Sequence, residues 1–216
     1  MSSRDKKVAE VVGHKGSVKA NDYSQLLGQR PLTIWLTGLS GAGKSTLAFA
    51  LERYLIDIGH ACCVLDGDNI RQRLNKDLGF SHQDRTENIR RIAEVTRLMN
   101  DAGLIVITSF ISPYRNDRKL AQQIIGSEHF MEVYVKTSIE VCEARDPKNM
   151  YKRARAGEIS GFTGVNAPYE EPLNPEIEID TSSSTILECL EKLLFVLISR
   201  ITISQNYKQK RDTPNE

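Results

Sequence analysis

Eight consecutive residues, from Gly38 to Ser45, carry the most specific chemical signal in this sequence. They read GLSGAGKS and match the phosphate-binding pattern GxxxxGK[ST] without a mismatch. Glycines let the backbone form a concave nest whose N–H groups converge on a phosphate. Lys44 adds a charge that can follow the β- and γ-phosphates, and the Ser45 hydroxyl is a hard oxygen ligand for Mg²⁺. We therefore predict that the phosphates of a nucleotide bind at Gly38, Leu39, Ser40, Gly41, Ala42, Gly43, Lys44, Ser45 and Thr46, with Mg²⁺ at Ser45.

The residues on either side of this motif have the pattern that such a loop requires. Pro31 opens the apolar run LTIWLT, residues 32–37, which predicts a buried strand. Residues 45–58 have helical spacing, so a helix would point its positive N-terminal end at the phosphates. A glycine-rich turn that arose by chance would lack this strand–loop–helix setting. The motif alone is nevertheless shared by kinases, GTPases, ATPases and regulatory nucleotide binders.

Two carboxylates, Asp66 and Asp68, follow the second expected strand, residues 61–65. In open α/β sheets, ligands bind beyond the carboxyl ends of the strands, so these side chains would face the phosphate site. Two carboxylates there can coordinate Mg²⁺ and can orient or deprotonate an acceptor hydroxyl. An Asp-Gly pair is also an ordinary surface turn, and spacing alone does not separate the two interpretations.

A third group of polar residues lies on an expected helix, residues 83–101. Arg85 and Asn88 are three residues apart and therefore share one face of that helix. Arginine can bind phosphate or sulfate through two N–H groups, and asparagine can hydrogen-bond a base or a hydroxyl. Arg71 adds a cation one element away. A solvated charged face would show the same pattern, so both interpretations stay open at this point.

Two later segments can reach the same edge of the sheet. Ser112 follows the third expected strand, residues 104–110, where it can contact a substrate or cap the next turn. Residues 145–164 are rich in Arg, Lys and Gly, as expected for a lid that closes over phosphates. An RNA-binding patch or a plain exposed helix would have a similar composition. The formal net charge of only +1 makes RNA the weaker option.

The order of the elements predicts the fold class and the domain organisation. Further strands are expected at 130–135 and 177–180, and further helices at 69–74, 116–125, 139–143 and 185–203. Strands that alternate with helices indicate an α/β fold, a nucleotide-kinase-like parallel sheet flanked by helices with right-handed crossovers. A length of 216 residues suits one domain. We expect a polar N-terminal extension at 1–30, a P-loop kinase domain at 31–203 with a lid at about 145–165, and a polar C-terminal tail at 204–216.

Composition and missing motifs narrow the function further. A guanine-reading NKxD motif is absent, and this length has no room for the large extra elements of other ATPase classes. A small-molecule kinase is therefore favoured. The N-terminus lacks the apolar core of a signal peptide, and no apolar run is long enough to span a bilayer. The four cysteines form no CxxC pair and sit in apolar surroundings, as buried thiols in a reducing compartment do. We predict a soluble cytoplasmic protein that binds neither nucleic acid nor membrane.

Several longer motifs follow the phosphate loop in order. They are LDGDNIR at 65–71, GFSxxDRxENIRR at 79–91, FISPYR at 110–115, YKRARAGEIxGFTG at 151–164 and PYExP at 168–172. Together, over about residues 32–181, they closely resemble the adenylyl-sulfate kinase family. The resemblance implies a P-loop kinase fold with a lid. It also implies that ATP phosphorylates the 3′-hydroxyl of adenosine 5′-phosphosulfate to give 3′-phosphoadenosine 5′-phosphosulfate.

The resemblance also assigns roles to individual residues. Catalytic roles would fall on Lys44, Asp66, Asp68 and Ser112, with Ser45 and Asp66 at the metal. Phe80 and Phe162 would sandwich the acceptor adenine, as aromatic faces can. The substrate-binding set it implies is Asp68, Arg71, Phe80, Arg85, Asn88, Ile111, Ser112, Lys148, Gly161 and Phe162. The family is commonly homodimeric, and the resemblance leaves room for functional coupling to ATP sulfurylase.

Two features of the resemblance keep alternatives open. Ser112 occupies a position often assigned a phosphoserine intermediate, whereas a kinase that holds donor and acceptor together needs only positioning and charge neutralisation. We therefore favour direct transfer. The usual KGLY before the lid reads KNMY at 148–151, and the missing glycine can alter lid flexibility or nucleotide affinity.

The alternative functions are a small kinase for a nucleoside, a sugar acid or shikimate, and a regulatory protein that binds ATP without turnover.

Overall fold

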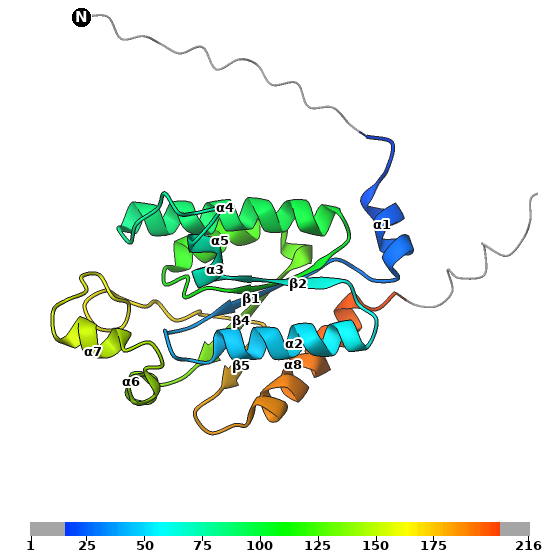
Figure 1. Ribbon diagram of the computed structural model, residues 1–216. Helices are drawn as coiled ribbons and strands as arrows, with labels where there is room; N and C mark the ends of the chain where they lie inside the picture. Colours follow the sequence, from blue (N-terminus) through cyan, green and yellow to red (C-terminus); the bar gives the residue numbers. More distant parts are fainter. Residues whose placement is uncertain (1–15, 204–216) are drawn as a thin grey trace, which may run out of the picture.

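The computed structural model describes residues 16–203 and has a parallel five-stranded sheet at its centre (Figure 1). The strands are β1 (Thr33–Thr37), β2 (Cys62–Asp66), β3 (Ile105–Ser109), β4 (Phe130–Lys136) and β5 (Ile177–Asp180). Their spatial order is β2-β3-β1-β4-β5, and every neighbouring pair is parallel. Every strand expected from the sequence is present. The predicted α/β class is confirmed.

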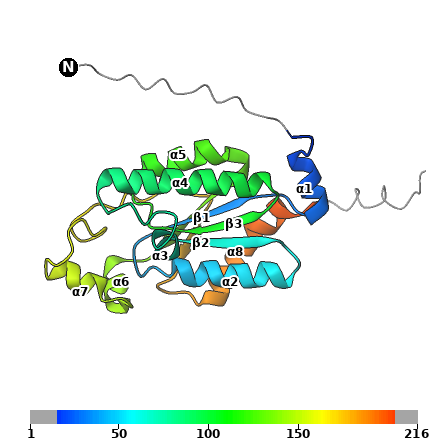
Figure 2. The same cartoon turned by 45° about the horizontal axis from the view of Figure 1, so that its top comes forward.

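Helices cover both faces of the sheet. They are α1 (Ala20–Leu27), α2 (Lys44–Asp57), α3 (Gly67–Arg71), α4 (His82–Asp101), α5 (Arg115–Ile125), α6 (Ile139–Arg145), α7 (Met150–Arg155) and α8 (Ile186–Ile201), with a short 3₁₀ turn, η1 (Ser127–His129). Helices α4 and α5 lie over one face, and α2 and α8 lie over the other (Figures 1 and 2). This is the three-layer arrangement expected of a parallel sheet.

Strand β1 is held from both sides because its residues alternate between the two faces. All five of its residues are buried. Ile34 and Leu36 join the apolar core beneath α2 and α8, whereas Trp35 joins the core beneath α4 and α5. The Trp35 ring lies 6.2 Å from Phe110 and 5.6 Å from Phe130, measured between ring centroids. The loop after β1 therefore starts from a rigid position in the middle of the sheet.

A short helix that the sequence analysis did not predict precedes the sheet. Helix α1 packs on Gly103, where an added Cβ atom would lie 2.9 Å from Tyr23 and 3.0 Å from Leu27. Gln29 is fully buried, and its amide donates to the carbonyls of Ala61 at 2.8 Å and Gly103 at 2.9 Å. Part of the expected N-terminal extension is thus joined to the domain.

The loops that could carry function gather where the strands end. The loop after β1 leads into α2, α3 follows β2, and α6 and α7 project beyond this edge of the sheet (Figure 1). Connections that leave β1 and its neighbour β3 in different directions create the crevice in which such sheets bind ligands. Within residues 16–203, no helix is long and apolar enough to cross a membrane. Residues 1–15 and the expected tail at 204–216 lie outside the described part of the chain.

Candidate active site

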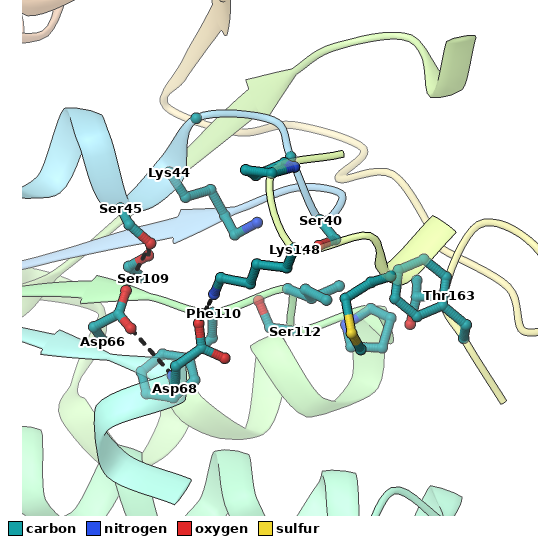
Figure 3. A pocket seen from close by; sticks show the side chains of 18 of the residues that line it. Ser40, Lys44, Ser45, Asp66, Asp68, Ser109, Phe110, Ser112, Lys148 and Thr163 are labelled. Atoms are coloured by element: carbon teal, nitrogen blue, oxygen red, sulfur yellow. Dashed lines mark hydrogen bonds and ion pairs between the residues drawn. The ribbon is translucent and has the colours of Figure 1, made fainter. Parts of the chain in front are cut away.

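One cavity of about 760 Å³ lies at the carboxyl ends of the strands. Its walls come from the phosphate loop, α3, the start of α4, the loop after β3, and the lid. Figure 3 shows side chains from the phosphate loop, α3, the loop after β3 and the lid around it. Sites for small molecules and cofactors commonly have volumes of roughly 300–1,000 Å³. The volume of this cavity is therefore that of a small-molecule or cofactor site.

The phosphate loop takes a path that only glycine allows at two positions. A Cβ atom at Gly38 would lie 2.4 Å from the carbonyl oxygen of Val135 on β4. Gly43 has a φ of 90°, in the left-handed region, and directly precedes α2. These glycines let the loop pass close to the sheet and turn straight into the helix. Its backbone N–H groups and the positive end of α2 consequently face the cavity.

Lys44 lies at the bottom of this loop and is only 8% exposed. Its Nζ donates to the carbonyl oxygens of Gly38 at 2.9 Å and Leu39 at 2.6 Å. Burial lowers the pKa of Lys44 from 10.5 to about 8, because a desolvated ammonium is less stable than a neutral amine. A bound anionic phosphate would reverse that penalty. The ammonium is thus placed to gain most when a triphosphate arrives.

Ser45, Asp66 and Ser109 form a cluster of oxygen ligands beside Lys44 (Figure 3). The Ser45 hydroxyl donates to Asp66 Oδ2 at 2.7 Å and lies 3.1 Å from the Ser109 hydroxyl. Asp66 is 7% exposed. Within the described residues, no group of three His, Cys, Asp or Glu side chains could hold a metal by itself. A hydroxyl with one carboxylate instead suits Mg²⁺, which keeps waters and takes further oxygens from phosphates.

Asp66 also has a structural role that explains the start of α3. Its Oδ1 accepts a hydrogen bond from the Asp68 backbone N–H at 3.1 Å, so Asp66 is the N-cap of this helix. The helix begins at Gly67, two residues earlier than the expected helix at 69–74. Asp68 therefore projects from the first turn into the cavity, where it pairs with Lys148 of the lid (Figure 3).

The far end of the cavity holds two arginines around one aromatic ring. Arg71 lies 4.5 Å and Arg85 lies 5.8 Å from the centroid of the Phe80 ring, which is 62% exposed. Burial lowers the pKa of both guanidinium groups, and for Arg71 the neighbouring Arg85 lowers it further. Arg85 also reaches the lid, where it donates to the Gly161 carbonyl at 2.6 Å and the Thr163 hydroxyl at 3.2 Å. Two close, partly desolvated cations favour an anionic ligand.

The side walls of this end are buried and hydrogen-bonded. Asn88 is 4% exposed and accepts a hydrogen bond from Asn75 at 2.9 Å. Phe162 is 7% exposed, with its ring edge-on to Tyr151 at a centroid distance of 4.9 Å. Phe80 and Phe162 both line the cavity, although only Phe80 presents an open face.

Ser112 lies between the two ends of the cavity and is 2% exposed. Its hydroxyl accepts a hydrogen bond from the Trp35 indole N–H at 3.2 Å. The neighbouring carbonyl of Ile111 accepts one from the Thr37 hydroxyl at 2.8 Å. Ser112 has a φ of 39°, a conformation that residues other than glycine rarely adopt and that clusters at functional sites.

Comparison with known proteins identifies the family to which this site belongs. The family model described as adenylylsulphate kinase matches residues 30–180. The chain belongs to the adenylylsulphate kinase family. The adenylyl-sulfate kinase of Vibrio cholerae is 50% identical over 202 residues, which cover 94% of each chain. That of Oceanobacillus iheyensis is 52% identical over 191 residues, covering 88% of this chain and 96% of the relative.

A solved structure of the same family superposes closely. The adenylylsulphate kinase of Mycobacterium tuberculosis, determined in complex with AMPPNP and APS, is 44% identical, with a TM-score of 0.75. The match covers 78% of this chain and 98% of that one. It confirms the P-loop kinase fold inferred from the motifs.

In this chain, the cavity brings together residues that are far apart in sequence. All ten predicted substrate-binding residues line it, from Asp68 to Phe162. Of the predicted nucleotide-binding residues, Ser40, Gly41, Gly43, Lys44, Ser45 and Thr46 line it too. Gly38, Leu39 and Ala42 do not. The carbonyls of Gly38 and Leu39 instead accept hydrogen bonds from Lys44, and the Ala42 carbonyl accepts one from the Thr181 hydroxyl.

Sequence reasoning missed the part of the donor end that lies beyond the phosphate loop. Arg145 was assigned to the lid, but its guanidinium donates to the Thr181 carbonyl at 2.6 Å and the Thr181 hydroxyl at 3.2 Å. The Thr181 hydroxyl in turn donates to the Ala42 carbonyl of the phosphate loop at 2.8 Å. Ile186 and Cys189 complete this wall from the start of α8. A single arginine in a basic run carried no signal that could have identified this contact.

Proposed function

We propose that this member of the adenylylsulphate kinase family transfers the γ-phosphoryl group of ATP to the 3′-hydroxyl of adenosine 5′-phosphosulfate. The products are ADP and 3′-phosphoadenosine 5′-phosphosulfate. One observation carries the proposal: a single cavity has a phosphate cradle at one end and two arginines around an exposed aromatic ring at the other. The relative from Mycobacterium tuberculosis, solved with an ATP analogue and APS, supports the same pairing of ligands.

The donor end would bind and neutralise the triphosphate. Lys44 and the loop N–H groups would hold the β- and γ-phosphates. The wall formed by Thr181, Ile186 and Cys189 would contact the adenine of ATP. The Ser45 hydroxyl and the Asp66 carboxylate would hold Mg²⁺, since they offer the hard oxygens that it prefers. When bound, Mg²⁺ supplies positive charge that stabilises the transferring phosphoryl group.

The acceptor end would bind the phosphosulfate and the adenine. Arg71 and Arg85 offer planar N–H groups that match a phosphate or sulfate, and the Phe80 ring offers a face on which a base can stack. Phe162 and Asn88 would form the opposite wall. An acceptor held in this way directs its ribose toward the middle of the cavity, where Asp68 lies.

Asp68 would orient the 3′-hydroxyl and accept its proton. It projects into the cavity from the first turn of α3, whereas Asp66 is engaged by Ser45 and by the helix backbone. Asp68 is paired with Lys148, and both side chains are more than half exposed, so the pair is weak and exchangeable. Lys148 would move to the phosphates when ATP binds, leaving Asp68 free for the acceptor.

Direct transfer is favoured over a phosphoserine at Ser112. A serine nucleophile needs an adjacent general base, but the Ser112 hydroxyl accepts its hydrogen bond from the Trp35 indole. Phosphorus stereochemistry decides between the two routes. With ATP chiral at the γ-phosphorus, one direct displacement inverts the configuration, whereas a route through phosphoserine inverts it twice and returns net retention.

The substrate is tested by ADP release with a panel of acceptors. We expect strong release with adenosine 5′-phosphosulfate, and far less with adenosine 5′-phosphate, which lacks the sulfate. Shikimate, gluconate and nucleosides should give only the acceptor-free rate. Preferential turnover of one of these would replace the proposed substrate. ATP binding without turnover of any acceptor would favour the regulatory alternative.

We further propose a cytoplasmic homodimer that is functionally coupled to ATP sulfurylase. All four cysteine thiols are free, as expected in a reducing compartment. Phe195 and Leu187 of α8 are 88% and 63% exposed, which gives the monomer apolar surface for a second subunit to cover. Light scattering of the purified protein should give twice the chain mass. Coupling predicts that added ATP sulfurylase, with ATP and sulfate, sustains product formation without added acceptor.

A further inference from the structure

A buried arginine, Arg118 of α5, lies beneath the loop that follows β3. We call residues 110–113 the acceptor loop. The Arg118 side chain is 3% exposed, and its Nε donates to Glu132 Oε1 on β4 at 2.6 Å. A buried guanidinium is destabilising unless its N–H groups are paired, so the partners of the remaining groups show what holds it there.

Those partners belong to two segments that are far apart in sequence. Nη1 donates to the Ser112 carbonyl at 2.7 Å, and Nη2 donates to the Glu170 carbonyl at 2.7 Å. One planar side chain thus joins the acceptor loop, β4 and the segment that follows the lid. A lysine ammonium at this position keeps the charge but lacks the fixed fork that reaches three separate acceptors.

The acceptor loop needs such support because Ser112 has a φ of 39°. A residue in that region keeps its conformation only when its surroundings impose it. The sheet supplies part of the constraint through the Trp35 indole, which donates to the Ser112 hydroxyl, and the Thr37 hydroxyl, which donates to the Ile111 carbonyl. Arg118 donates to the Ser112 carbonyl at 2.7 Å, an oxygen that the Thr37 hydroxyl approaches only to 3.4 Å.

The segment after the lid is tied to the same loop. The Glu170 N–H donates to the Pro113 carbonyl at 2.8 Å, and the Glu170 carboxylate accepts from the Arg115 N–H at 2.8 Å. The Tyr169 hydroxyl lies 3.0 Å from the Thr37 hydroxyl. Arg118 therefore lies where the C-terminal end of the lid meets the acceptor loop.

We infer that Arg118, paired with Glu132, is a positioning residue for the phosphoryl acceptor. It sets the backbone of Ser112 and Ile111, which line the cavity, although Arg118 itself does not line it. The inference rests on the proposed function, which places adenosine 5′-phosphosulfate against this loop. Displacement of a positioned reactant by about 1 Å can lower a rate by about a hundredfold.

The test compares Arg118→Lys with a matched control, Arg97→Lys. Arg97 of α4 also pairs with a carboxylate and also donates to α5 carbonyls, those of Ile124 and Ile125, but at the end of α5 remote from the cavity. We expect Arg118→Lys to lower kcat/KM for adenosine 5′-phosphosulfate by about ten- to a hundredfold, mainly through KM. KM for ATP should stay within about twofold, since the donor end is untouched. Arg97→Lys should change neither KM.

A purely structural role would give a different result. Arg118→Lys would then melt at a lower temperature but keep both wild-type KM values when assayed well below melting, which would overturn the inference. If that variant does not fold, Glu132→Gln keeps one carbonyl oxygen for Arg118, while it removes the negative charge and replaces the other oxygen by an amide NH₂. It should raise KM for the acceptor alone, and an unchanged KM would equally overturn the inference. A wild-type enzyme without acceptor-dependent turnover refutes the proposed function instead.

Discussion

The two ends of the cavity are built in opposite ways. The phosphate cradle of the donor end is local, because it is one run of residues between β1 and α2. The acceptor end is assembled from α3, α4, the acceptor loop and the lid, which tertiary contacts alone bring together. The donor end should therefore tolerate changes elsewhere in the chain. The acceptor end should respond to changes in residues that never touch a ligand.

The charged side chain of the phosphate cradle is buried and bonded locally, whereas those that join α3 to the lid are exposed and bonded across the cavity. Lys44 is buried, and its ammonium is bonded to carbonyls of its own loop. The ion pair of Asp68 and Lys148 joins α3 to the lid, with side chains 63% and 61% exposed. Exposed pairs contribute little to stability. The donor end is thus preorganised, whereas the lid contact can be exchanged for contacts to a ligand.

The largest effect is expected at the donor end, from Lys44→Ala. Turnover should fall about 10³-fold or more, since a preorganised charge on the transferring group is lost. The fold should persist, because the variant removes a desolvated ammonium. Steady-state ADP release and circular dichroism check the two statements. A folded variant with a near-wild-type rate would contradict the role of Lys44.

At the meeting point of the two ends, Asp68→Ala should lower turnover by about a hundredfold, as expected when a positioned general base is removed. Affinity for ATP, measured by calorimetry, should not fall, because Lys148 is released from its ion pair. Asp101→Ala is the control. Like Asp68, Asp101 is an exposed carboxylate in an ion pair, and its partner is Arg97. Equal rates for the two variants would remove Asp68 from the mechanism.

A smaller and selective effect is expected from Phe80→Ala at the acceptor end. Loss of one stacking face should raise KM for adenosine 5′-phosphosulfate about tenfold. KM for ATP and the melting temperature should stay unchanged, because the ring is 62% exposed. Phe49→Ala removes a ring that is 46% exposed on α2 and does not line the cavity, so it should alter neither KM. A rise in KM for ATP instead would show that the adenine of ATP, and not that of the acceptor, stacks on Phe80.

The smallest effect is a pH dependence confined to the donor end. Burial lowers the pKa of Lys44 to about 8 in the free enzyme, so the ammonium that attracts phosphates is lost as the pH rises through this value. kcat/KM for ATP should therefore decline above about pH 8. kcat should decline less, because bound phosphate favours the charged amine. A flat profile of kcat/KM between pH 7 and 9.5 would contradict this assignment.

The sequence predicted the donor end and the sheet because both are encoded locally. The apolar run at 32–37 and the eight-residue motif specify strand, loop and helix without reference to distant residues. The acceptor residues were found through motif resemblance, because the spacing of Arg85 and Asn88 alone favoured a solvated charged face. Helix α1 was missed although Gly28 is its C-cap in the left-handed region, because the helix buries none of its residues.

Other features could not be predicted because they depend on how distant segments meet. Arg118 is one charged residue in a polar helix, and only the structure shows that it is buried against Glu132. Helix α7 lies within the basic run that the composition indicated only as a lid. The pairing of Lys148 with Asp68 joins two exposed side chains 80 residues apart, and no sequence pattern specifies such a contact.

The most direct test of the central claim follows the γ-phosphate itself. Purified protein is mixed with Mg²⁺ and γ-labelled ATP, with and without adenosine 5′-phosphosulfate, and the labelled product is identified. The shared cavity predicts acceptor-dependent loss of label from ATP and its appearance on the 3′-oxygen of the acceptor. Release of label at the same rate without the acceptor, or its appearance on any other molecule, would contradict the claim.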